Sequence, residues 1–181
     1  MLTRVILTYA DYAAIPNDGR RYELHEGEVS VTPAPSPKHQ EVGFRLAVQL
    51  HQHVMERNLG KIWVSPIDVI LDVATVVQPD IVLVASERLG AVSGRGIEGP
   101  PTLVVEILSP ATAQIDRTVK FQLYARHGVP FYWIVEPDAR TIDVFELTNE
   151  GYGLATRLDG PRPVALPPLV DLALDPATIW P

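Results

Sequence analysis

The segment Leu103–Leu108 is an almost unbroken apolar run that contains a single acidic residue, Glu106. A short run of this kind is typical of a strand that is buried on both faces of a sheet. An ionised carboxylate in such a strand is costly unless it is ion-paired or bound to a metal. Any fold of this chain must therefore give Glu106 a partner, and the sequence leaves two: a salt bridge to a helix residue or a metal ion.

The apolar pattern divides the rest of the chain into strands and two helices. Alternation over 20–33 around Glu26-Gly27 predicts a β-hairpin, and an apolar stripe after Ser36-Pro37 predicts a helix over about 37–59. A second helix is expected between about 112 and 126, ended by Gly128. Further strands are expected at 62–64, 69–71, 81–84, 131–135 and 142–147, with a flexible loop over 85–101 and, from 160, a Pro-rich tail that ends in a short helical turn.

These elements predict an α+β fold with a central mixed β-sheet flanked by helices and an N-terminal β-hairpin. The 181 residues suit one domain, 1–181, and are too few for two of ordinary size. The N-terminus lacks the long apolar stretch of a signal peptide, and no run approaches the roughly 18 apolar residues of a transmembrane helix. We therefore expect a cytoplasmic protein that makes no membrane contact.

Charge and cysteine usage exclude several classes of function. Asp and Glu number 22 against 15 Lys and Arg, for a net charge of −7, which argues against a protein that coats nucleic acid by phosphate neutralisation. A small basic cleft on an acidic body stays compatible with this balance, so that any DNA contact would be local. The sequence has no cysteine, which excludes thiol nucleophiles, disulfides and zinc–thiolate sites.

Asp80 is a second acid in an unusual place, after Pro79 and at the start of the apolar segment 81–84. Carboxylates from two adjacent buried strands would form the oxygen-rich site that Mg²⁺ or Mn²⁺ prefers. An ordinary turn acid is the other interpretation of Asp80. On the second helix, Lys120 lies one turn after Asp116, so it either serves such a site by offsetting charge or forms a surface pair with Asp116.

Three histidines on the first predicted helix are weaker candidates. His51 and His53 are two residues apart, so they face different sides of a helix and are poor co-ligands; a solvated helix face explains both. His39 lies in the first turn, where it either hydrogen-bonds a site carboxylate or a phosphate, or serves in capping and packing.

The order of several motifs resembles a known family. They are Tyr22-Glu23-Leu24, Gly27-Glu28, Pro35-Ser36, His39, Pro79-Asp80, Glu106-Ile107-Leu108-Ser109-Pro110, Asp116, Lys120, Tyr124, Gly128-Val129 and Tyr132-Trp133. In this order they resemble the Uma-type family of restriction-endonuclease-like proteins, within the PD-(D/E)XK nuclease superfamily, from about residue 8 to the C-terminus. The resemblance implies a restriction-endonuclease-like core with the active site on its central hairpin.

The same resemblance implies roles for individual residues. Asp80 matches the Asp of the family's Pro-Asp motif and Glu106 the acid of its Glu-x-Lys element, where Leu108 replaces the lysine. The family places that lysine on the following helix, which corresponds to Lys120. Glu23 matches a further acid of such sites, although an exposed hairpin residue is the other interpretation.

Three functions are consistent with these residues. The first is a Mg²⁺- or Mn²⁺-dependent endonuclease that hydrolyses DNA phosphodiester bonds, with Asp80, Glu106 and the main-chain carbonyl of Ile107 as metal ligands and Lys120 and Glu23 as catalytic residues. The second is a catalytically silent module with the same fold that binds nucleic acid or protein. The third is a metal-dependent hydrolase of a smaller phosphodiester or nucleotide. A double-strand cut needs two sites, which is compatible with a homodimer.

Overall fold

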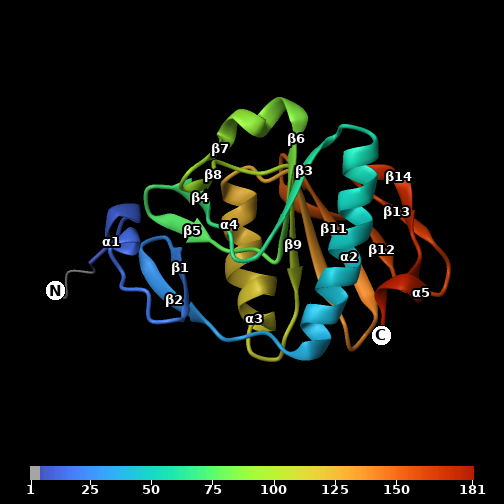
Figure 1. Cartoon of the computed structure of the whole chain (residues 1–181), viewed down its shortest axis with the longest axis horizontal. Coiled ribbons are helices and arrows are strands. Elements are labelled where there is room, and N and C mark those ends of the chain that lie inside the picture. Colours follow the sequence, from blue (N-terminus) through green and yellow to red (C-terminus); the bar gives the residue numbers. More distant parts are fainter. Residues whose placement is uncertain (1–4) are drawn as a thin grey trace.

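The computed structural model describes residues 5–181 and confirms the α+β fold with mixed sheets and few helices (Figure 1). The strands of this part of the chain form two six-stranded sheets and one two-stranded sheet, and one of the six-stranded sheets is the central mixed sheet expected from the sequence. The additional sheet arises because the N-terminal hairpin does not extend the central sheet but pairs with short strands from residues 69–98.

The first six-stranded sheet contains the predicted hairpin, β1 (Arg21–His25) and β2 (Glu28–Thr32), which pair in antiparallel fashion. The turn between them uses Gly27 at φ 84°, a backbone conformation that glycine adopts without a steric penalty. The strand order of this sheet is β2-β1-β5-β4-β8-β7. Its other strands are β4 (Val69–Asp72), β5 (Thr75–Val77), β7 (Val92–Ser93) and β8 (Gly96–Glu98).

The second six-stranded sheet forms the centre of the molecule and is mixed, because β9 and β10 are parallel while its other neighbours are antiparallel. Its order is β12-β11-β10-β9-β6-β3, with β3 (Gly60–Val64), β6 (Ile81–Ala85), β9 (Leu103–Ile107), β10 (Phe131–Glu136), β11 (Thr141–Thr148) and β12 (Gly151–Leu158). The strand β9 lies inside this sheet and is buried along its whole length, as its apolar sequence predicts.

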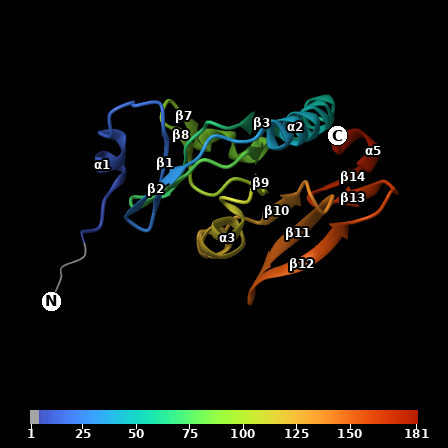
Figure 2. The same cartoon turned by 90° about the horizontal axis from the view of Figure 1, so that it is seen from below.

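Two helical layers cover the central sheet (Figure 2). The long helix α2 (Pro37–Glu56) packs on one face, and on the other lies a continuous helical segment made of α3 (Ala113–Ile115), a π-helical turn (Asp116–Lys120) and α4 (Phe121–Arg126). Leu103, Val105 and Ile107 belong to the core under α2. Because side chains alternate along a strand, Val104 and Glu106 face the α3–α4 side.

The boundaries of α2 have local causes. The hydroxyl of Ser36 accepts a hydrogen bond from the main-chain N–H of His39, which confirms the predicted helix start. The helix ends at Glu56, three residues before the predicted end at 59, because Asn58 adopts a left-handed conformation at φ 54°. His53 is buried at 5% exposure, so the solvated face predicted for it is wrong; His51 is exposed as expected.

Several other segments differ from the prediction. The region 85–101 is not a simple loop: it forms a 3₁₀ helix (Ser86–Ala91) followed by the short hairpin β7–β8, whose strands are too short to show a period. The strand β12 has no counterpart in the prediction, because its exposed and partly exposed residues do not alternate and only Leu158 is buried. The tail forms a hairpin, β13 (Val164–Leu166) and β14 (Leu169–Leu174), before the helical turn α5 (Pro176–Ile179).

The remaining helix, α1 (Tyr9–Ala13), lies beside the N-terminal hairpin (Figure 1). None of the helices found between residues 5 and 181 is both long and apolar enough to cross a membrane.

Candidate active site

The register of the central sheet places Asp80 opposite Glu106. Ile81 pairs with Val105 in the antiparallel ladder of β6 and β9, so one step further along both strands brings Asp80 level with Glu106. The main-chain N–H of Ile107 donates a 2.8 Å hydrogen bond to Asp80 Oδ2, which fixes this carboxylate immediately before the start of β6. Like charges placed directly opposite on neighbouring strands destabilise a sheet. A stable fold does not need two acids at this position, so their pairing suggests a functional role.

His39 approaches the same oxygen of Asp80 from the first turn of α2. Its Nε2 lies 3.1 Å from Asp80 Oδ2, and both side chains are largely shielded from solvent. Of the two roles considered for His39, the structure therefore has its side chain in contact with a site carboxylate.

Glu106 is buried at 3% exposure and accepts two hydrogen bonds through a single oxygen. The ammonium of Lys120 lies 3.0 Å from Glu106 Oε1, and the hydroxyl of Tyr124 donates to the same atom at 2.6 Å. Lys120 and Tyr124 are four residues apart, on the face of the α3–α4 segment that is turned toward β9. The salt bridge to a helix residue, one of the two partners considered for Glu106, is thus present.

Lys120 also contacts two further acids. Its Nζ lies 2.9 Å from Glu23 Oε1 and 3.7 Å from Asp116 Oδ1. Glu23 is only 2% exposed, so its interpretation as an exposed hairpin residue is wrong, and the pairing of Lys120 with Asp116 is buried rather than at the surface. The structure therefore brings Glu23, Glu106 and Lys120 together, with Asp80 facing Glu106 across the two strands.

Additional polar groups hold Glu23 in place. The main-chain N–H of Gln78 donates to Glu23 Oε1 at 2.7 Å, and His25 Nε2 lies 3.1 Å from the other oxygen, Oε2. Tyr124, His25 and Gln78 had not been selected as site residues from the sequence. Spacing could have found two of them: Tyr124 follows Lys120 by one helical turn, and His25 follows Glu23 by two residues on the same side of a strand.

The electrostatics of the cluster are dominated by burial and by one shared cation. Burial raises the pKa of Glu106 well above its usual 4.5; Lys120 opposes this, while the charges of Asp116, Asp80 and Glu23 add to it. Burial also raises the pKa of Asp116 above 3.8. Three carboxyl groups, those of Glu23, Glu106 and Asp116, thus share a single buried ammonium, and Asp80 lies opposite Glu106.

The pKa values of Glu23 and Lys120 move in opposite directions. Burial alone would raise the pKa of Glu23, but the charge of Lys120 and the hydrogen bonds from His25 and Gln78 outweigh it, so the pKa lies well below 4.5. Burial alone would lower the pKa of Lys120, but the charges of Glu106, Glu23 and Asp116 outweigh it and raise the pKa above its usual 10.5. Lys120 is therefore a permanently charged donor at physiological pH.

The chemistry of the donor set fits a hard divalent cation. The hydrogen bonds and ion pairs of Asp80 and Glu106 use Oδ2 and Oε1, so that Asp80 Oδ1 and Glu106 Oε2 have no hydrogen-bond partner among residues 5–181. Both residues line a cavity of about 30 Å³, together with Ile107 and Lys120. No group of three or more acidic or histidine side chains in this part of the chain is arranged to hold a metal, so main-chain oxygen and water would have to complete the coordination.

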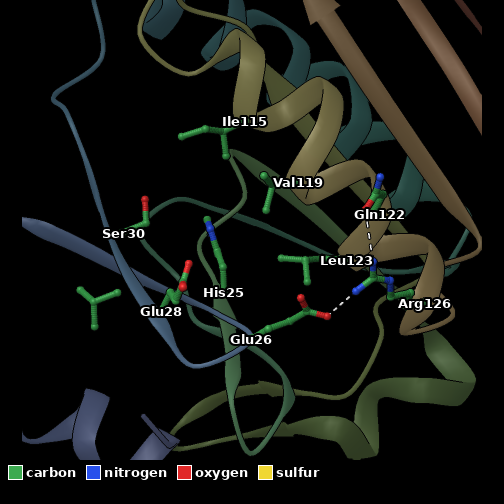
Figure 3. Close-up of a pocket in the computed structure, with 10 residues that line it drawn as sticks. His25, Glu26, Glu28, Ser30, Ile115, Val119, Gln122, Leu123 and Arg126 are labelled. Atoms are coloured by element: carbon green, nitrogen blue, oxygen red, sulfur yellow. Dashed lines mark hydrogen bonds and ion pairs between the residues drawn. The ribbon is translucent and has the colours of Figure 1, made fainter. Parts of the chain in front are cut away.

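A larger cavity of about 440 Å³ lies between the β1–β2 hairpin and the α3–α4 segment (Figure 3). Its walls include His25 and Val119, and an ion pair between Glu26 and Arg126 lies at one side. Asp80, Glu106 and Lys120 do not line this larger cavity. The candidate active site is therefore the smaller cavity, which all three residues line. His25 contacts Glu23, and Glu23 in turn contacts Lys120, which lines the smaller cavity.

Comparisons with known proteins identify the family of the chain and a solved structure with a similar fold. The family model Uma2, described as "Putative restriction endonuclease", matches residues 9–177. The fold is similar to the crystal structure of a putative nuclease belonging to DUF820 from Anabaena variabilis, with a TM-score of 0.80, 20% sequence identity, and coverage of 96% of this chain and 97% of that chain. A search of the curated proteins found no match.

Proposed function

Because the chain belongs to the Uma2 family, described as putative restriction endonucleases, we propose that it is a divalent-metal-dependent nuclease that hydrolyses phosphodiester bonds of DNA. One observation carries the proposal: Asp80, just before β6, lies opposite Glu106 on β9, and each has one oxygen without a hydrogen-bond partner among residues 5–181. Two such oxygens beside a buried lysine are suited to a phosphate and its metal ion.

The metal would be Mg²⁺ or Mn²⁺, and Asp80, Glu106 and the main-chain carbonyl of Ile107 would hold it. When bound, such an ion lowers the pKa of water and neutralises charge on a phosphate. The lining of the cavity by both carboxylates and by Lys120 is consistent with these roles.

Lys120 would act as a charged hydrogen-bond donor rather than as a base. Its raised pKa keeps the ammonium protonated, and a fixed positive charge in a water-poor cavity stabilises negative charge that develops on a phosphate oxygen. Glu23 and Tyr124 would be positioning residues. Glu23 holds the ammonium at 2.9 Å, and Tyr124 fixes the oxygen of Glu106 that the ammonium contacts.

The overall charge of −7 restricts how DNA can bind. We propose a local contact at the site, sensitive to ionic strength, rather than an extended basic surface. A homodimer would supply the two sites that a double-strand cut requires.

The test is DNA cleavage in the presence of Mg²⁺ or Mn²⁺, with EDTA as the metal-free control. We expect metal-dependent cleavage by the wild-type chain and its loss in Asp80→Asn and Glu106→Gln. Asp143→Asn is the matched control, because Asp143 is also buried and ion-paired, with Arg157, but lies on β11 and does not line the cavity.

Three results would reject or redirect the proposal. Cleavage that survives both substitutions would reject these residues as the active site. Absence of cleavage together with absence of Mg²⁺ or Mn²⁺ binding by an intact fold would support the silent binding module instead. Hydrolysis of a nucleotide or small phosphodiester, without cleavage of DNA, would support the smaller substrate.

A further inference from the structure

A second small cavity adjoins the candidate active site on the α2 side. It has a volume of about 130 Å³ and lies between the N-terminal half of α2 and the start of β6. Three of its lining residues, His39, Asp80 and Ile107, also line the cavity that contains Glu106 and Lys120. A group bound in this second cavity would therefore sit directly beside a phosphate at the candidate active site.

The surface of α2 is shaped to leave this space open. Gly43 lies inside the helix, where glycine is unfavourable by about 1 kcal/mol relative to alanine. A Cβ at this position would come within 2.9 Å of Ile107 Cδ1, so the glycine allows the helix to approach β9 closely. Gly43 also lines the cavity, and because it has no side chain it takes up none of the cavity's space.

Beside this glycine, Phe44 presents an aromatic ring to solvent. It is 72% exposed, although a phenylalanine on an amphipathic helix is normally turned toward the core. Val64, at the end of β3, is 54% exposed and lines the same cavity. Two polar side chains, those of Gln40 and Ser65, complete the rim, and the main-chain N–H of Ser65 is fixed by a 3.0 Å hydrogen bond to the carbonyl of Asp80.

The size and lining of the cavity restrict what it can hold. At about 130 Å³ it is well below the roughly 300–1,000 Å³ of sites for drug-sized ligands, so it suits a single small ring system. An exposed aromatic face combined with an amide and a hydroxyl is the chemistry that proteins use to bind an unpaired nucleobase: the ring stacks and the polar groups read the base edge.

We propose that this cavity is a nucleobase subsite, in which the base next to the scissile phosphate stacks on Phe44. This inference rests on the proposed nuclease function and specifies its substrate, a nucleotide whose base is unpaired at the cut. Inside a duplex both faces of a base are covered by its neighbours, so contact with Phe44 requires a single strand or an extruded base.

The test measures binding separately from cleavage. Fluorescence anisotropy of a labelled oligothymidylate, in EDTA and at low ionic strength, reports binding without turnover. We expect the single strand to bind more tightly than a duplex of the same length, and Phe44→Ala to weaken single-strand binding on the order of tenfold. Phe44→Trp should retain it. Met55→Ala is the matched control, because Met55 is an apolar residue of the same helix, 49% exposed, and does not line the cavity.

Each outcome decides a different question. Equal effects of Phe44→Ala and Met55→Ala, duplex binding as tight as single-strand binding, or no binding of either probe would overturn the subsite. A change of oligomeric state in Phe44→Ala with unchanged oligonucleotide binding would also overturn it and assign the face to a second copy of the chain. Phe44-dependent binding without metal-dependent cleavage would support the subsite and reject the nuclease, whereas cleavage that is insensitive to Phe44→Ala would do the reverse.

Discussion

Lys120 reaches from the π-helical turn to Glu106 near the C-terminal end of β9, with 3.0 Å between Nζ and Oε1. π-Helical turns are uncommon and occur frequently at functional sites. The same ammonium contacts Glu23 on β1, so one side chain connects the α3–α4 segment to both six-stranded sheets. Removal of this one ammonium would therefore leave several buried carboxylates without a positive partner.

We predict that Glu106→Gln lowers cleavage activity while it raises stability relative to the wild type as pH rises. Loss of a group that only hydrogen-bonds to a metal ligand typically reduces metal affinity or activity by about 10–100-fold, so loss of a proposed ligand itself should reduce cleavage by more than about 100-fold. The native pKa of Glu106 is raised above 4.5, so its contribution to stability decreases as pH rises above 4.5. Thermal unfolding should therefore show Glu106→Gln gaining stability relative to wild type as pH rises. If Glu106→Gln instead lost stability relative to the wild type as pH rises, the raised pKa of Glu106 would be contradicted.

Lys120→Met should be strongly destabilising. It leaves Glu23, Glu106 and Asp116 buried without the ammonium that all three contact, a change that typically costs about 3–5 kcal/mol. Their pKa values would rise, so the native state would bind more protons than the unfolded state, and the loss of stability should increase with pH. Urea unfolding at acidic and neutral pH measures this. Lys61→Met, at an exposed lysine, is the control, and equal effects of the two substitutions would contradict the shared role of Lys120.

The sequence could single out Glu106 and Asp80 because strand burial is a local property. Glu106 interrupts one apolar strand and Asp80 precedes another, and the register of the two strands then places them opposite each other. The burial of Glu23 could not be predicted in this way. It depends on the pairing of β1 with β5, in which Leu24 lies opposite Val76, and β5 has only three residues.

Lys120 shows a second limit of prediction from sequence. Asp116, Lys120 and Tyr124 are evenly spaced, so they share one face of a helix. Apolar residues occur at other positions of the same segment, among them Val119 and Leu123, so spacing does not reveal which face is turned inward. In the structure the polar face is buried because β9 presents Glu106 to it.

His53 should make stability depend on pH in the weakly acidic range. It is buried on α2, and its Nε2 has no hydrogen-bond partner in the described part of the chain. Burial, with a smaller contribution from Arg57, lowers its pKa below 6.5. The stabilising contribution is therefore complete above pH 6.5 and is lost as pH falls toward the lowered pKa. Urea unfolding should show that His53→Leu removes part of this dependence, while His51→Leu, at an exposed position of the same helix, leaves it unchanged.

Tyr124→Phe tests whether the orientation of Glu106 matters for metal binding. The substitution removes only the hydroxyl that donates to Glu106 Oε1 at 2.6 Å, and the ring can keep its packing against Tyr132. Groups that orient a metal ligand are typically worth about 10–100-fold in affinity, so titration calorimetry should show Mn²⁺ binding weakened by that factor.

The control for this experiment is Tyr152→Phe. The hydroxyl of Tyr152 also donates a hydrogen bond, at 2.7 Å to the carbonyl of Val129, but it does not contact the site carboxylates. If both substitutions weaken Mn²⁺ binding equally, the effect comes from general destabilisation of the core. If Tyr124→Phe binds Mn²⁺ as the wild type does, Glu106 is held by Lys120 and the strand alone, and Tyr124 is a core residue without a positioning role.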